Sequence, residues 1–107
     1  MDESLLNEER FARSFARGYF RNKRWGKAKI KYELQQRQIH SRLIQTALTE
    51  IDEDEYTQTI EHLIEKKLNL LSSEKPLTKK QKVVNYLLQK GFQYSEFKGL
   101  LDNINTQ

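Results

Sequence analysis

Hydrophobic side chains recur every three or four residues along most of the chain, which is the spacing of amphipathic α-helices. The first such segment predicts a helix over about Asn7 to Asn22. At about 100° per residue, one side of this helix collects Phe11, Phe15, Gly18 and Tyr19. The opposite side collects an arginine ridge made of Arg10, Arg13, Arg17, Arg21 and Arg24. We expect the aromatic side to face inward and the ridge to face solvent.

A glycine lies inside this predicted helix. Gly18 costs about 1 kcal/mol relative to alanine in a helix interior. Because it falls on the aromatic side, it predicts a neighbouring helix that passes close by.

Five further helices follow from the same spacing. The predicted ranges are Gly26 to Gln38, Ser41 to Glu50, Asp54 to Leu71, Thr78 to Lys90 and Tyr94 to Asn103. Thr78 and Gln81 have the spacing of a capping box, and Gly91 suits the position after a helix end. The apolar residues predicted to face inward are Ile30, Leu34, Leu43, Ile44, Ala47, Leu48, Ile51, Tyr56, Ile60, Leu63, Ile64, Leu68, Val83, Val84, Leu87, Leu88, Phe97, Leu100, Leu101 and Ile104. No segment alternates as a strand does, so the fold class predicted is all-α.

The two halves of the chain match without a gap at an offset of 53 positions. Leu34, Gln36, Leu48 and Ile51 then meet identical residues, and Ile39 meets Phe92. Shared helical spacing alone gives some of this similarity. The register nevertheless extends over both halves, which favours tandem three-helix, helix-turn-helix-like repeats, elongated and curved. The predicted units are 1–52 and 53–107.

Charge is distributed very unevenly. The stretch 10–32 contains nine Lys or Arg and no acidic residue, whereas the rest contains fifteen acidic and ten basic residues. The net charge of +4 therefore combines +9 in this basic stretch with −5 elsewhere. Like charges repel unless something opposes them, so the basic stretch predicts an anionic partner, either phosphate or an acidic protein surface. The alternative is a solvated helix face.

The candidate binding residues all belong to this stretch. They are Arg10, Arg13, Arg17, Arg21, Lys23, Arg24, Trp25, Lys27, Lys29 and Lys31. Trp25 suits either stacking on a base or capping the core where two helices meet. Tyr19, Phe20 and Tyr32 are predicted to lie in the core or at its edge.

Other chemistry finds little support. The acidic residues from Glu50 to Glu55 lack the ligand pattern of a calcium loop and favour a helix start instead. His40 and His62 have no catalytic partner at a recognisable spacing, and no phosphate-binding or zinc motif occurs. The sequence predicts no enzyme, cofactor or metal site. The absence of cysteine and of a long apolar run predicts a cytoplasmic protein without a membrane segment. We also expect the protein to be monomeric.

The segment "ERFARSFARGYFRNKRWGKAKIKYELQQRQI" resembles the central block of the RecX family. The matching positions there are Arg10, Phe11, Ala12, Phe15, Lys23, Gly26, Ile30, Lys31, Leu34, Arg37 and Ile39. The closing "KQKVVNYLLQKGFQYSEFKGLLD" resembles the final block of the family through Lys90, Gly91, Phe92 and Phe97. His40 and Gln93 depart from the family, which usually has Asp or Ser as helix caps there. A further three-helix unit usually precedes this region and is expected to be missing.

The resemblance implies a non-enzymatic regulator of the RecA recombinase. Such a protein binds the RecA filament on single-stranded DNA and limits ATP hydrolysis and strand exchange. Two alternatives remain: a sequence-nonspecific DNA-binding module, and an adaptor that binds only acidic protein. Lysines at 27, 29 and 31 suit phosphates better than base edges, and no polar base-reading set is visible.

Overall fold

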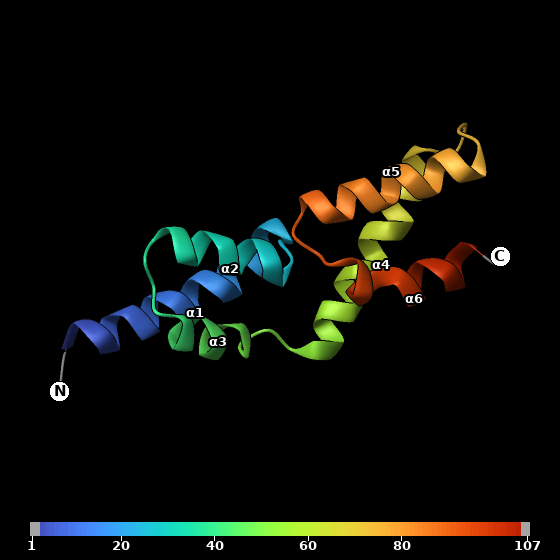
Figure 1. Cartoon of the computed structure of the whole chain (residues 1–107). Coiled ribbons are helices and arrows are strands. Elements are labelled where there is room, and N and C mark those ends of the chain that lie inside the picture. Colours follow the sequence, from blue (N-terminus) through green and yellow to red (C-terminus); the bar gives the residue numbers. More distant parts are fainter. Residues whose placement is uncertain (1–2, 106–107) are drawn as a thin grey trace.

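A computed structural model describes residues 3–105, with side chains described from 7 to 103 (Figure 1). This part of the chain is built from α-helices without a strand. The helices are α1 (Glu3–Lys23), α2 (Lys27–Gln36), α3 (Ser41–Leu48), α4 (Glu53–Leu70), α5 (Pro76–Gln89) and α6 (Tyr94–Asn105). The predicted all-α class is confirmed.

The helices form two triplets, and α1–α3 and α4–α6 repeat the same path. Helices α2 and α5 end 53 residues apart, and α3 and α6 begin 53 residues apart. Both turns place a residue at positive φ, Gln38 at 61° and Gly91 at 97°. The next residue closes each turn in the same way. The N–H of Ile39 donates to the Leu34 carbonyl at 3.1 Å, and the N–H of Phe92 donates to the Leu87 carbonyl at 3.0 Å. The tandem three-helix arrangement is therefore confirmed.

Four helix starts are stabilised differently. The predicted capping box at Thr78 is wrong, because α5 begins two residues earlier at Pro76, whose ring presets the helical φ.

Asp52 accepts the N–H of Glu55 at 3.0 Å at the start of α4. At α3, His40 Nδ1 accepts the N–H of Arg42 at 3.1 Å. At α6, the Gln93 N–H donates to the Glu96 carboxylate at 2.8 Å, which is one half of a capping box. His40 therefore replaces the Asp or Ser cap itself, whereas Gln93 relies on a carboxylate three residues later.

A single apolar core extends through both triplets. Its buried members are Ala12, Phe15, Ala16, Phe20, Ile30, Leu34, Ile44, Ala47, Ile51, Tyr56, Ile60, Leu63, Ile64, Val83, Leu87, Phe92, Phe97 and Leu101. Three predictions of inward or core-edge positions are wrong: Phe11 is 44% exposed, Tyr32 57% and Leu88 48%. Helix α1 packs against both α2 and α3, so its core face turns towards the small Ala12 and Ala16 and away from Phe11. The predicted position of Ile104 lies outside the described side chains.

The close approach predicted at Gly18 occurs elsewhere. A Cβ built at Gly18 meets no heavy atom within 4 Å, so that prediction is wrong. A Cβ at Gly26 would instead lie 2.3 Å from the carbonyl carbon and oxygen of Gly91. Gly26 opens α2 in the first triplet, and Gly91 lies in the α5–α6 turn of the second, so the two triplets meet backbone to backbone.

This junction completes the start of α2. Its N-cap residue, Gly26, has no side chain, and the second triplet supplies the acceptors. The N–H of Gly26 donates to the Lys90 carbonyl at 2.7 Å, and that of Ala28 donates to the Gly91 carbonyl at 3.1 Å. The Lys27 N–H donates to the Tyr56 hydroxyl at 2.9 Å. These three bonds hold the triplets in one extended body of 57 × 24 × 21 Å.

Candidate anion-binding surface

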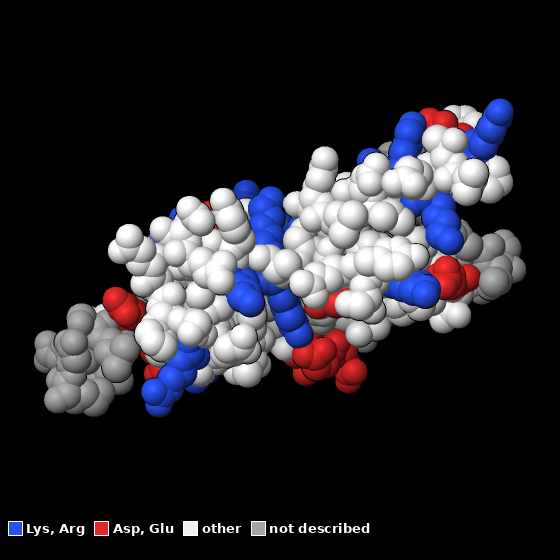
Figure 2. Space-filling view, viewed as in Figure 1, with Lys and Arg blue, Asp and Glu red and all other residues white. Residues whose placement is uncertain are grey.

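The basic stretch occupies α1 from Arg10 to its end, the α1–α2 turn and the first half of α2. In Figure 2, Lys and Arg side chains form a band across the middle of the molecule, where the two triplets meet. Acidic side chains gather beside this band, over the region where α4 begins in Figure 1. The charges of both signs therefore lie close together in the folded chain.

Part of the basic stretch is opposed by carboxylates within the protein. Glu50, just after α3, binds both Arg13 at 3.0 Å and Arg17. Around the start of α4, Glu55 binds Arg21 at 3.2 Å, and Glu53 binds Lys27 at 2.7 Å. Four of the nine cations in the basic stretch are therefore opposed by carboxylates of the protein itself. Sequence analysis assigned the acidic segment to a helix start alone, although its five carboxylates within six residues were a signal of a partner for the ridge.

These ion pairs do not bury the ridge. The four basic side chains keep between 23% and 60% of their surface exposed. Arg24 is exposed as predicted, and Arg10 and Lys31 are exposed as well. Pairs between partly exposed side chains are screened by solvent and contribute little to stability. The paired residues therefore keep part of their surface open to solvent.

The pH dependence of stability should report the Glu50 ion pairs. Its hydrogen bond from Arg17, together with the charges of Arg17 and Arg13, holds the pKa of the carboxyl below its usual 4.5, although partial burial opposes this. A carboxyl with a lowered pKa stabilises the folded state fully above its unfolded pKa, and the stabilisation is lost as pH falls through the folded pKa. We expect wild type to melt above a Glu50→Gln variant at pH 6, and the difference to shrink as pH falls below 4.5.

Thermal melts from pH 3 to 6 measure this difference. A Glu61→Gln variant is the control, because Glu61 is exposed and forms no ion pair among the described residues. A gap between wild type and Glu50→Gln that stays constant down to pH 3 would contradict the role of the pair.

A second group of cations has no carboxylate partner among the described residues. Arg24 and Lys29 take part in none of the ion pairs formed by the described residues, and Lys90 of the α5–α6 turn joins them. The Lys90 ammonium donates to the Lys23 carbonyl at 2.9 Å. Burial, followed by the charges of Lys29 and Arg24, lowers the pKa of Lys90. We call Arg24, Lys29 and Lys90 the junction cluster. Sequence analysis missed Lys90, because nothing local marks a residue 61 positions from Lys29 as its neighbour.

Trp25 packs as a cap on the core. Its ring stacks on Tyr19 with centroids 4.5 Å apart, and the Lys29 ammonium lies 4.5 Å from its centroid. The ring is partly buried against the apolar core. These contacts favour the capping interpretation of Trp25 over the stacking one, because two neighbours already occupy its surroundings.

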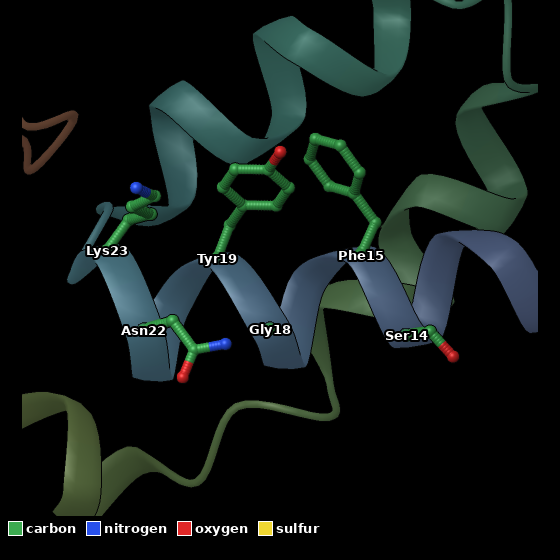
Figure 3. Close-up of a pocket in the computed structure, with 6 residues that line it drawn as sticks. All are labelled: Ser14, Phe15, Gly18, Tyr19, Asn22 and Lys23. Carbon is green, nitrogen blue, oxygen red and sulfur yellow. The ribbon is translucent and has the colours of Figure 1, made fainter.

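A shallow hollow lies along α1 beside the basic stretch. Figure 3 shows the rings of Phe15 and Tyr19 on one side of the helix and Ser14 and Asn22 on the other, with Gly18 between them. The missing side chain at Gly18 opens this hollow, and Lys23 lies at its end.

The described part of the chain shows neither a metal site nor a membrane-spanning helix. No three His, Cys, Asp or Glu side chains there gather closely enough to hold a metal ion. None of the helices there combines the length and the apolar character needed to cross a membrane.

Comparison with known proteins identifies both triplets. Residues 7–48 match the family model of the second three-helix domain of RecX, and residues 53–99 match that of the third. Two relatives named Regulatory protein RecX, from Clostridium perfringens strains SM101 and 13, are each 32% identical over 93 residues. The alignment covers 85% of this chain and 43% of each relative, so the chain spans less than half of their length. No solved structure gives a significant match.

Proposed function

This chain belongs to the RecX family, and on that premise we propose that it regulates a RecA-type recombinase by binding the recombinase filament on single-stranded DNA. The protein limits ATP hydrolysis and strand exchange without catalysing a reaction or using a cofactor. It acts as a cytoplasmic monomer in which units 1–52 and 53–107 form one continuous module. The observation that carries the proposal is the consecutive match of both triplets to the second and third RecX domains.

The geometry supports this proposal in two ways. The body is 57 Å long but only 24 × 21 Å in cross-section, so it can lie along a filament and contact several subunits. Its basic stretch offers exposed cations to a long anionic lattice, in which nucleic-acid phosphate and acidic protein surface both occur. Such a surface holds its partner without reading a base sequence.

The regulatory role is tested by adding the protein to recombinase filaments preformed on single-stranded DNA. We expect ATP hydrolysis and strand exchange to slow as the protein concentration rises. Unchanged rates at concentrations that saturate binding would contradict inhibition, and undetectable binding would contradict the proposed partner.

The role of the basic stretch is tested by the triple variant Arg17→Gln, Arg21→Gln, Lys27→Gln. Neutral glutamine removes three charges without setting a new carboxylate against Glu50, Glu53 or Glu55. At about 0.5 kcal/mol for each exposed charge pair, filament affinity should fall roughly tenfold. Binding should also weaken as salt rises.

A matched control keeps the same net charge. Lys66, Lys75 and Lys98 are exposed, belong to the second triplet and form no ion pair among the described residues. Their triple glutamine variant should retain filament affinity within about twofold, because these lysines lie outside the basic stretch and exposed charges that do not contact the partner are largely screened at physiological salt. Equal losses in both variants would mean that net charge matters and the basic stretch does not.

The alternative of a sequence-nonspecific DNA-binding module is favoured by one observation, the junction cluster, whose three cations form no ion pair among the described residues. Affinity for bare single-stranded DNA, measured beside affinity for the filament, separates the two functions. A recombinase regulator binds the filament more tightly than the bare strand, whereas a DNA-binding module binds both equally.

A further inference from the structure

Three cations from both triplets converge where the triplets meet. Lys29 lies directly against the α5–α6 turn, since a Cβ built at Gly91 would be 2.3 Å from the Lys29 Cβ. Lys90 reaches across in the other direction and donates to the Lys23 carbonyl at 2.9 Å. Arg24 is exposed in the turn between α1 and α2, with a left-handed φ of 56°. The junction cluster therefore depends on the packing of one triplet on the other.

The cluster differs from the paired cations of the basic stretch in its electrostatics. Carboxylates lie at the distances of ion pairs from Arg13, Arg17, Arg21 and Lys27. At the cluster, burial lowers the pKa of Lys90, and the charges of Lys29 and Arg24 lower it further. Like charges held together without a counter-charge are unfavourable in the free protein. Such an arrangement is typical of a site whose counter-charge arrives with a ligand.

Two members of the cluster, Lys29 and Lys90, are also held in place before any ligand binds. The Lys29 ammonium lies 4.5 Å from the Trp25 ring centroid, and the Lys90 ammonium lies 5.8 Å from that of Tyr86. Because Trp25 also stacks on Tyr19, its ring is not free as a platform for a base. The ammonium groups of Lys29 and Lys90 suit a phosphate group, which accepts hydrogen bonds from several directions. Phosphates are the same in every nucleotide, so binding them requires no recognition of a base.

We propose that the junction cluster of Arg24, Lys29 and Lys90 binds backbone phosphates of single-stranded DNA, as one site that both triplets build. This inference rests on the proposed function, in which single-stranded DNA forms part of the filament, and it adds Lys90 of the second triplet to the binding residues. Binding at this place counters the mutual repulsion of the cations and bridges α2 to the α5–α6 turn. The bound strand therefore crosses the junction and contacts both units.

The test is the salt dependence of binding to a labelled oligothymidylate. Each phosphate contact to a single strand contributes about 0.7 to the slope of log affinity against log salt. The double variant Lys29→Gln, Lys90→Gln should therefore reduce the magnitude of that slope by about 1.4. The control Lys66→Gln, Lys98→Gln removes two exposed lysines outside the cluster and should leave the slope unchanged. Equal slopes in all three proteins, or equal reductions in both variants, would overturn the inference.

A local signal and a charge-retaining variant complete the test. Trp25 is the only tryptophan, so its emission reports on the cluster directly. Emission should change when the oligothymidylate binds to wild type and should stay constant in Lys29→Gln, Lys90→Gln. The variant Lys29→Arg, Lys90→Arg keeps both charges and should retain the wild-type slope. Loss of the slope in the arginine variant would show that the glutamine effect is structural and would overturn phosphate binding.

The recombinase assay separates this inference from the proposed function. If the slope falls as expected but wild type leaves filament ATPase unchanged, the phosphate site stands and the proposed function fails. If wild type slows the ATPase but the cluster variant keeps the wild-type slope, the proposed function stands and the phosphate site fails.

Discussion

Replacing Gly26 with alanine is expected to lower the free energy of unfolding by about 3 kcal/mol, the upper end for overpacking a tight site. The added Cβ would lie 2.3 Å from the carbonyl carbon and oxygen of Gly91 and 2.4 Å from the amide nitrogen of Phe92. These are backbone atoms, so no side-chain rotation relieves the overlap. The triplets have to separate, which stretches the bond from Gly26 to Lys90 at 2.7 Å and the bond from Ala28 to Gly91 at 3.1 Å.

Urea denaturation measures this change, and Gly18→Ala is the matched control. At Gly18 a Cβ meets nothing within 4 Å, and alanine favours the helix interior by about 1 kcal/mol. The two Gly→Ala substitutions should therefore move stability in opposite directions. Similar midpoints for Gly26→Ala and wild type would show that the junction yields easily and does not fix the two triplets.

Truncating Phe92 to alanine is expected to lower the free energy of unfolding by about 4 kcal/mol, within the range for large aromatic side chains in cores. Phe92 is 1% exposed and follows the turn that contacts α2. Its ring centroid lies 5.3 Å from that of Tyr56, whose ring in turn lies 5.7 Å from that of Phe20. The truncation therefore leaves a cavity in an aromatic chain that joins both triplets.

Phe11→Ala provides the control for Phe92→Ala. Phe11 is 44% exposed, so its removal should cost less than about 1.5 kcal/mol, since most of its apolar surface is not buried on folding. Chemical denaturation of both variants gives the comparison. Equal losses would mean that Phe11 is buried as its position in the sequence repeat suggests, and that the exposed placement is wrong.

The contrast between Phe11 and its repeat equivalent shows where sequence reasoning ends. At the offset of 53, Phe11 corresponds to Ile64, which is fully buried. Both residues occupy the same face of a similar amphipathic pattern, yet only Ile64 is covered. Helical periodicity predicts which residues share a face, but the angle at which neighbouring helices pack decides which part of that face is covered.

The sequence likewise predicted only part of the candidate site. The basic stretch and its exposure were visible in the sequence, because charge and helical spacing are local properties. The pairing of particular carboxylates with particular cations was not visible, since Arg13 and Arg17 lie 37 and 33 residues from Glu50. Lys90 joined the cluster only because the α5–α6 turn packs on the start of α2. Which cations remain without an internal partner is therefore a tertiary property.

Within residues 3–105, the sequence by itself determined the six helices and their grouping into two similar triplets, and it also determined the resemblance to RecX. These follow from patterns repeated within a few residues or over a constant offset. The tertiary structure alone decided that Gly26 and Gly91 touch, that Gly18 stays open, and that Glu50 binds part of the ridge. The physical reason is that such contacts join residues distant in the chain, and their geometry depends on how each triplet packs on the other.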